Sequence, residues 1–218
     1  EIINELKPSN NQITQNSTAH LDPDIRYEVN RHRKENWKPI FGQAGAAETH
    51  LKNLKVAVDD IFLFFGWFKQ TEYLDGRLRY KKGSPDLHII FGYLQIGEIY
   101  SYGSKFPDFA LDHPHCHPQF KHLNPNCIYV AKDNLSFNAS LKGANTLKFN
   151  PNLVLTKDGM SKSKWSVPNF FRELSISYHS PDSFKEAYFQ SVAKGQEFVI
   201  SPNAKLTDWV KHLIESNT

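Results

Sequence analysis

The chain has very little cysteine and no long apolar run. Its 218 residues include 2 cysteines, Cys116 and Cys127, which do not form a Cys-x-x-Cys pair. This cysteine content argues against a disulfide framework, and we expect a reducing, cytoplasmic location. No apolar stretch approaches the ~18 residues that a membrane helix needs, so we expect no membrane partner.

The chain also lacks the local signatures of the common enzyme classes. It contains no Gly-x-Ser-x-Gly elbow, no His-Glu-x-x-His pair and no dinucleotide fingerprint. Residues 160–163 (Met-Ser-Lys-Ser) are similar to the ATP-binding loop of class I aminoacyl-tRNA synthetases, but Gly159 replaces the first lysine of that loop. A lysine-rich surface turn explains the segment better. The sequence therefore leaves open whether the chain is an enzyme.

Aromatic residues, by contrast, are abundant. They make up 13% of the chain, which predicts a core built largely from rings. The densest stretch, residues 60–68, is short, β-branched and aromatic, as is typical of a strand buried on both faces. Gly66 allows close backbone approach in this strand, and Trp67 offers a flat face to the core or to a nucleobase. We expect Trp67 to border a pocket.

The order of apolar stretches predicts a fold rich in strands. Residues 87–99 form a second buried strand, in which Gly92 and Gly97 indicate bulges or tight bends. Helices are expected at 44–54, 182–193 and 205–216, and shorter strands at 126–131, 135–138, 146–149, 152–156 and 197–200. We therefore predict an α+β fold, with a compact curved or closed mixed sheet and flanking helices.

The N-terminal residues differ in composition from the rest of the chain. Residues 8–19 are polar and rich in turn formers, so we expect a flexible segment over 1–19 and a single domain over 20–218. Because the first residue is Glu rather than Met, we expect the numbering to begin inside a longer chain.

Basic side chains gather in one glycine-containing stretch. The formal charge of +3 allows a local basic face without requiring nucleic acid as a partner. Residues 75–86 contain Gly76, Gly83 and Pro85, which predict a mobile connection. Four side chains there are candidates for contacts with a nucleic-acid backbone: Arg77, Arg79, Lys81 and Lys82.

The densest group of metal-ligand types is His-Pro-His-Cys-His-Pro at 113–118. His113, His115 and His117 alternate, so on an extended segment they would share one face and could bind a transition metal. The spacing does not match structural zinc sites, and we predict no metal or other cofactor from it. The alternatives are histidines that line a ligand pocket and a proline-stiffened loop with ordinary hydrogen bonds.

Two further polar features precede the aromatic strand. Asp22 and Asp24 could hold a divalent cation on an extended segment, although Asp-Pro-Asp is more typical of a turn. Gln43 stands between two glycines before a predicted helix and offers an amide that could read a base edge.

Segments throughout the chain resemble one family. They include His-Leu-Asp-Pro-Asp-Ile-Arg at 20–26 and Asp-Ile-Phe-Leu-Phe-Phe-Gly-Trp-Phe at 60–68. The other matching segments are 37–47, 50–51, 88–98, 113–115, 126–131, 165–168 and 195–199. The resemblance is to the nucleotide modification associated domain family, the third of that name, found in bacteria and phages. It covers most of the chain from about residue 20 onward.

A weaker resemblance links the two long strands to PUA-like domains, including the EVE and ASCH groups. Such domains hold a modified base in an aromatic pocket of a small barrel, so the resemblance implies a similar architecture and pocket. This is an analogy of fold and implies no chemistry by itself.

The resemblance implies a role in DNA base modification, with nucleic acid or a nucleotide as partner and DNA favoured. A binding module would hold a modified base on candidate residues Phe41, Gln43, Phe65, Trp67, Tyr93, His113, His115 and Trp165. An enzyme of nucleotide modification would instead use His113, His115 and Asp22 as acid, base or ligand groups. In a structural role the rings would only fill the core. Base identity and oligomeric state remain open.

Overall fold

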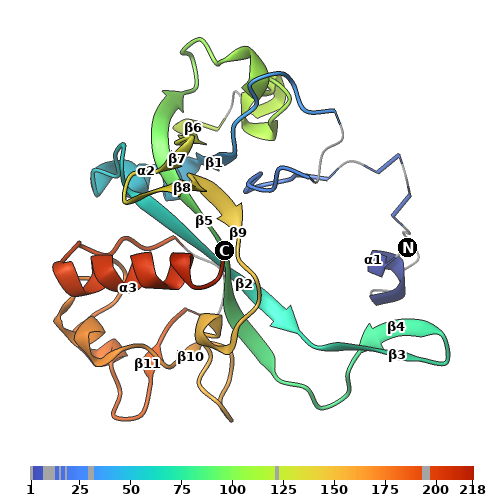
Figure 1. Cartoon of the computed structure of the whole chain (residues 1–218), viewed down its shortest axis with the longest axis vertical. Helices are drawn as coiled ribbons and strands as arrows, with labels where there is room; N and C mark the ends of the chain where they lie inside the picture. The colour runs from blue at the N-terminus through green and yellow to red at the C-terminus, as the bar shows by residue number, and fades with distance from the viewer. Residues whose placement is uncertain are drawn as a thin grey trace.

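The structure, a computed structural model, describes residues 2–6, 13–14, 16–17, 19–28, 32–120, 123–192 and 197–218. Its main sheet has the order β1-β6-β5-β2, with β9 also paired to β5. The bounds of these strands are Ile40–Ala44 (β1), Ile61–Lys69 (β2), Asp86–Ser101 (β5), Asn126–Ala131 (β6) and Ala144–Thr146 (β9). All pairs between these strands are antiparallel. Figure 1 shows β5 running through the molecule as the strand that joins both ends of the sheet.

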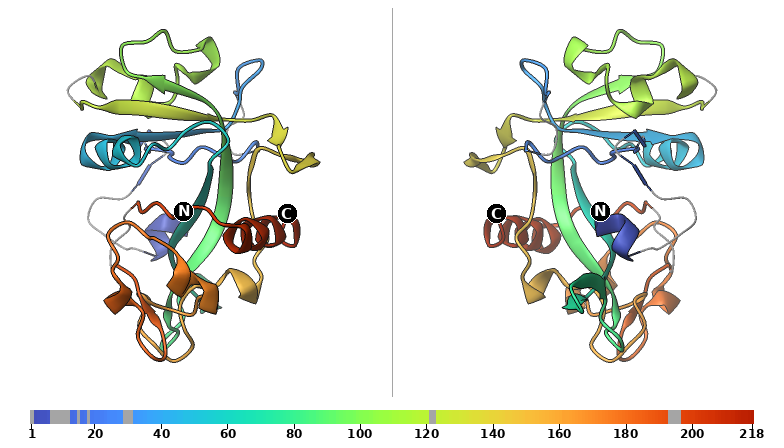
Figure 2. Two further views of the ribbon diagram at one scale, coloured as in Figure 1. Left: turned by 90° about the vertical axis from the view of Figure 1, so that its left-hand side faces the viewer. Right: turned by 90° about the vertical axis from the view of Figure 1, so that its right-hand side faces the viewer.

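The sheet is strongly curved, and bulges on β5 account for the curvature. The pairing of β2 with β5 shifts register opposite Gly92, and the pairing of β5 with β6 shifts at Gly97. A Cβ on Gly97 would lie 2.9 Å from the Lys132 nitrogen, so only glycine permits this close approach. The bend of β5 is visible in Figure 2. The predicted α+β fold with a curved sheet and flanking helices is confirmed, but the main sheet is antiparallel and not mixed.

Smaller elements surround this sheet. Two-stranded sheets pair β3 (Thr71–Leu74) with β4 (Arg77–Tyr80), β7 (Asn134–Leu135) with β8 (Asn138–Lys142), and β10 (Lys164–Trp165) with β11 (Phe189–Gln190). The α-helices are α1 (Ile2–Leu6), α2 (Gly45–Asn53) and α3 (Ala204–Glu215). Short 3₁₀ turns are η1 (Asp108–Ala110), η2 (Pro114–Cys116), η3 (Pro118–Phe120), η4 (Pro151–Leu153), η5 (Asn169–Glu173) and η6 (Pro181–Ser183).

The predicted helices at 44–54 and 205–216 are confirmed as α2 and α3. The side chain of Asn203 caps α3 by accepting a hydrogen bond from the Leu206 N–H. The helix predicted at 182–193 is wrong for its described residues, which contain the end of η6 and strand β11. There the Phe184 ring packs against Phe189 in an aromatic cluster, and this tertiary packing overrides the helical pattern.

Among the shorter strands, only 126–131 is confirmed in full, as β6. The strands predicted at 152–156 and 197–200 reduce to isolated bridges at Val154, Thr156 and Ile200. The basic connection at 75–86 is not a simple loop, because its first half forms β4. Asp75 and Gly76 both have positive φ, as a tight hairpin turn requires.

Both faces of β2 are covered, as the aromatic pattern predicts. Phe62 and Phe64 pack into the cluster around Tyr129, whereas Phe65 on the opposite face packs with the C-terminal segments. Trp67 ends this pattern and is 65% exposed. The part of the chain that the structure describes contains no helix with the length and apolarity needed to cross a membrane.

Candidate functional site

The histidine loop folds against β1 and β6 at one end of the sheet. Its turn η2 begins at Pro114, whose fixed φ suits the first position of a helical turn. The His113 side chain accepts a hydrogen bond from the His115 backbone N–H across this turn. Gly42 on β1 leaves room for the loop, since a Cβ there would lie 2.3 Å from the His115 ring. The loop therefore packs directly against the backbone of β1 at Gly42.

Asp22 lies at the centre of a cluster with His20, His113 and His115, which we name the Asp22 cluster. Its Oδ2 atom lies 3.4 Å from His115 Nε2 and 3.8 Å from His20 Nε2. Its Oδ1 atom lies 3.6 Å from His113 Nε2 and accepts a hydrogen bond of 2.9 Å from the Gly42 N–H. Three imidazoles thus point toward one carboxylate.

Asn126 fixes the orientation of His115. The Asn126 amide donates to the His115 carbonyl at 2.9 Å, and its Oδ1 lies 2.7 Å from His115 Nδ1. Because that oxygen can only accept a hydrogen bond, His115 carries a proton on Nδ1. Its Nε2 is directed toward Asp22. The Phe120 ring stacks on His115 with an interplanar angle of 9°. Stacking on Phe120 and the hydrogen bond to Asn126 therefore fix the orientation of the His115 ring.

The pKa values in the Asp22 cluster favour an ionised carboxylate. Burial alone would raise the pKa of Asp22, but His113, His115 and the Gly42 N–H outweigh burial and place that pKa below its ordinary value. Burial would lower the pKa of His115, yet Asp22 and Asn126 raise it. Burial lowers the pKa of His20 despite the attraction of Asp22. An ionised carboxylate surrounded by imidazoles can take part in proton transfer or bind a cation.

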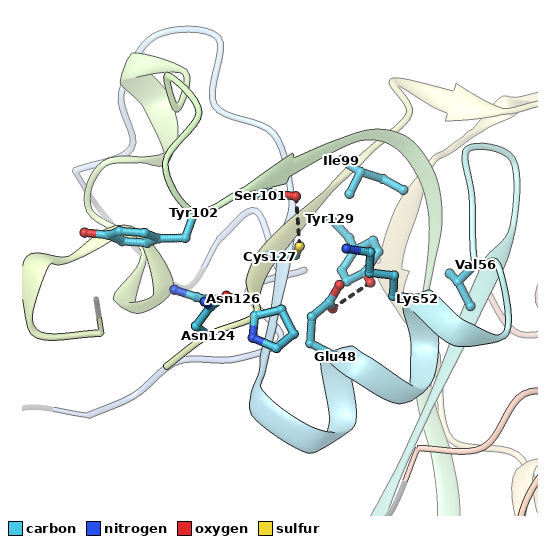
Figure 3. A pocket seen from close by; sticks show the side chains of 11 residues that line it. Glu48, Lys52, Val56, Ile99, Ser101, Tyr102, Asn124, Asn126, Cys127 and Tyr129 are labelled. Carbon is cyan, nitrogen blue, oxygen red and sulfur yellow. Dashed lines mark hydrogen bonds between the residues drawn. The ribbon is translucent and has the colours of Figure 1, made fainter. Parts of the chain in front are cut away.

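A polar cavity of about 270 Å³ is lined by residues of α2, β5 and β6 (Figure 3). Cys127 and Tyr129 on β6 face the cavity, and Asn126, which also lines it, bonds His115 of the Asp22 cluster. Glu48 and Lys52, one turn apart on α2, line the same cavity. Asn126 therefore lies between this cavity and the Asp22 cluster.

Glu48 is the principal acidic group of the cavity. It is only 3% exposed, and its Oε2 accepts a hydrogen bond of 2.7 Å from the Tyr129 hydroxyl. Burial and this bond raise the pKa of Tyr129, and burial raises the pKa of Cys127 to about 11. The hydroxyl and the thiol are thus neutral at physiological pH, and the carboxylate is the hydrogen-bond acceptor that they face.

A smaller cavity, of about 190 Å³, lies beside His113 and is lined by Asp24, Arg33 and Trp37. Arg33 binds both oxygens of Asp24, with N–O distances of 2.5 and 2.7 Å, and lies over the Trp37 ring. Asp22 faces histidines and Asp24 faces an arginine, so these two carboxylates have different partners.

The predicted base-binding rings do not meet in one pocket. Tyr93 is fully buried, and its hydroxyl donates to the Lys142 carbonyl. Phe41 packs edge-on against Phe62 in the core. Trp67 lies outside the linings of both cavities and carries the Lys162 ammonium 3.6 Å above its ring.

The remaining candidates lie elsewhere. Phe65 and Trp165 contact each other edge to face at 5.1 Å in a buried cluster. Gln43 donates to Glu197 at 2.6 Å, and this bond occupies its amide. His117 is exposed at the end of η2. The structure therefore brings together His113, His115 and Asp22, and it separates the aromatic candidates from them.

The four basic candidates lie on or beside the β3–β4 hairpin, which projects from the body of the sheet (Figure 1). All four side chains are exposed. Arg79 pairs with Glu72 across the hairpin at 3.2 Å. The hairpin thus presents positive charge away from both cavities.

Sequence reasoning grouped His20 with Asp22 and Asp24 but did not place it beside His113 and His115. It also missed Asn126 and the Glu48–Tyr129 pair as site residues. His20 joins Asp22 because the segment at 19–28 crosses β1, where Asp24 and Ile40 bond to each other through their backbones. The alternation of β6 would have placed Asn126 and Tyr129 on opposite faces. No local pattern, however, relates Glu48 to Tyr129.

Comparison with known proteins gives one match. Residues 1–201 match the family model described as nucleotide modification associated domain 3. No curated protein and no solved structure matches the chain. The match includes the N-terminal residues that precede the segments recognised in the sequence.

Proposed function

The chain belongs to the nucleotide modification associated domain 3 family, and from this premise we propose that it binds a nucleobase in the polar cavity beside Glu48. The base would belong to a nucleotide or to a DNA strand. The observation that carries the proposal is the buried carboxylate of Glu48, which lines a cavity together with amide groups, a lysine and an aromatic ring. The PUA-like resemblance stays a prediction.

The cavity offers the groups that recognise a base. A carboxylate accepts hydrogen bonds from the amino group of a base, and the amide of Asn124 can both donate and accept. Tyr102 also lines the cavity, but its ring points away from Glu48 (Figure 3) and packs edge-on against Phe106 at 6.0 Å. Stacking on a base, which contributes about 1–3 kcal/mol, would require this ring to turn toward the cavity. Lys52 supplies a positive charge for a phosphate. The volume suits a single base better than a large ligand.

DNA is the partner that the surface charge favours. The β3–β4 hairpin carries exposed basic side chains, and Tyr73 on the same hairpin is 73% exposed. Basic groups interleaved with exposed rings are typical of surfaces that follow a nucleic-acid strand. We therefore include a DNA strand, contacted by this hairpin, in the proposal.

The test is calorimetric titration of the protein with deoxynucleoside monophosphates, including 5-methyl-dCMP and N6-methyl-dAMP. We expect at least one to bind with sub-millimolar affinity. Glu48→Gln keeps the shape of the side chain and a partner for Tyr129 but removes the charge. Hydrogen bonds to charged groups contribute about 1.5–3 kcal/mol, so this variant should bind at least about tenfold more weakly.

The matched control is Glu186→Gln, which removes an exposed carboxylate outside the cavity lining. It should bind like the wild type. Absence of binding by every nucleotide, or wild-type affinity in Glu48→Gln, would contradict the proposal.

A second candidate is an enzyme of nucleotide modification. The observation that favours it is the convergence of His113 and His115 on Asp22, which provides acid and base groups within 3.6 Å. His20 is half-exposed, so a substrate would approach the Asp22 cluster from its side. This candidate requires nucleotide turnover that is abolished in Asp22→Asn.

A further inference from the structure

We propose that His20, Asp22 and His115 form a binding site for a divalent transition-metal ion, with His113 orienting the carboxylate. None of these three ligands lines the nucleobase cavity, so the proposal does not rest on that cavity. No local spacing in the sequence predicts this ligand set, because His20 and His115 come from distant segments.

The positions of the three ligand atoms fit a metal. One ring nitrogen each of His20 and His115 and an oxygen of Asp22 all lie within 4.8 Å of one another. The contacts from Asp22 Oδ2 measure 3.4 Å to His115 and 3.8 Å to His20. Ligand atoms on a tetrahedral metal with bonds of ~2.1 Å lie about 3.4 Å apart, so small side-chain rotations would complete the site.

The surroundings of the ligands match those of known metal sites. A metal-binding histidine commonly donates its other ring N–H to a protein oxygen, as His115 does to Asn126. Asp22 is held through Oδ1 by the Gly42 N–H, which leaves Oδ2 directed at the two imidazoles. Both arrangements orient the first ligands before any ion binds.

His113 provides an independent sign that the cluster is incomplete. Its Nε2 is buried and has no hydrogen-bond partner among the described residues. The nearest carboxylate oxygen, Asp22 Oδ1, lies 3.6 Å away. A small movement of Asp22 toward a bound ion could bring this pair to hydrogen-bond distance. Buried polar groups without partners are rare and need such an explanation.

The donor set determines the class of metal. Two imidazole nitrogens and one carboxylate suit zinc, iron, cobalt or nickel, whereas magnesium and calcium prefer oxygen ligands alone. Three protein ligands also leave an open position, as in catalytic metal sites. Cys116 does not join the set, since it is not part of the group of converging ligand atoms and packs against the apolar cluster around Ile40 and Ile128.

The test uses the full chain, stripped of metal by a chelator, and titrates it with Zn²⁺ and separately with Co²⁺. We expect one equivalent of each to bind, with an absorption band from bound Co²⁺, and no competition from millimolar Mg²⁺. His20→Ala should weaken binding at least about tenfold. The His20 side chain is 44% exposed, so this variant should fold, and circular dichroism would verify that. Asp22→Asn should show a larger loss.

His117→Ala is the matched control, because it removes an exposed imidazole from the same loop. It should bind both ions with wild-type affinity and stoichiometry. Failure of the wild type to bind one equivalent would overturn the proposal. Wild-type affinity in His20→Ala, or an equal loss in His117→Ala, would do so as well. Because no nucleotide is present, either result leaves the nucleobase proposal untouched.

Discussion

Gly42 is the residue on which the Asp22 cluster most directly depends. A Cβ at this position would lie 2.3 Å from one carbon of the His115 ring and 2.9 Å from the His113 ring. His115 lies in the short turn η2 and His113 caps it, and Asn126 also holds His115, so neither ring can move freely. The absence of a side chain at one strand position thus permits the contacts of two histidines with Asp22.

Gly42→Ala should therefore displace η2. Overpacking of this kind costs about 1–3 kcal/mol of folding free energy, and we expect metal affinity to fall at least about tenfold. Gly45→Ala is the control: its φ of +62° makes alanine strained, yet no atom lies within 4 Å of the added carbon. Denaturant unfolding and zinc titration of both variants check this. Loss of stability in both but of metal affinity in neither would contradict the role given to Gly42.

His88 is a second residue whose environment makes a measurable prediction. It is buried, and its Nδ1 accepts a hydrogen bond of 3.0 Å from the Trp165 indole. Burial lowers the pKa of His88, and the charge of Lys162 lowers it further. Folding therefore favours the neutral ring, which alone can accept this bond.

The free energy of unfolding should therefore decrease as the pH of the solution falls and His88 becomes protonated. The contribution of neutral His88 is fully present above the unfolded pKa of ~6.5 and is lost as the pH falls from there toward the lowered folded pKa. The slope is at most about 1.4 kcal/mol per pH unit. His88→Gln should show a shallower decline between pH 7 and pH 5 in denaturant titrations. An unchanged slope would show that His88 does not contribute.

At the scale of elements, the β3–β4 hairpin is the clearest candidate for contact with nucleic acid. Its Asp75–Gly76 turn is a strong hairpin signal, although the glycines and basic residues around it also fit a mobile connection. Helix α1 lies against the hairpin, where Glu5 accepts a hydrogen bond of 2.7 Å from the Leu78 N–H. The hairpin is thus supported by α1 while its basic side chains stay exposed.

Replacing Arg77, Arg79, Lys81 and Lys82 with glutamine should weaken binding of single-stranded DNA. The slope of log K against log salt should fall by about 0.7 for each phosphate on a single strand that the variant no longer neutralises. Surface changes of this kind should each alter stability by less than about 0.5 kcal/mol. Fluorescence anisotropy at several salt concentrations measures the effect. Lys205→Gln with Lys211→Gln, on α3, is the control, and an equal loss of affinity there would contradict a specific role of the hairpin.

The elements that could be predicted from sequence are those with strong periodic or apolar patterns. The long runs of β2 and β5 and the capped helix α3 carry their own local signals. The segment 150–200 does not: its described part consists of short turns and bridges around buried rings such as Trp165 and Phe189. Packing between distant residues decides its structure, and no local period reports that packing.

At the scale of the whole molecule, one sheet carries two polar sites, the Asp22 cluster against β1 and β6 and the Glu48 cavity beside β5 and β6. The sequence indicates one of them, because histidines at alternate positions stand out locally. It does not indicate that His20 approaches them, or that Glu48 meets Tyr129 across the fold. Its aromatic pattern points to a base pocket, whereas Tyr93, Phe65 and Trp165 pack in the core. Whether an aromatic side chain is buried or exposed depends on how the sheet packs against the rest of the fold, and the local sequence does not show this.

The most direct test of the proposed function is a crystal structure of the protein with its tightest-binding nucleotide. We expect the base in the cavity, with its edge within hydrogen-bond distance of the Glu48 carboxylate. A nucleotide bound elsewhere, with this cavity unoccupied at saturating concentration, would contradict it.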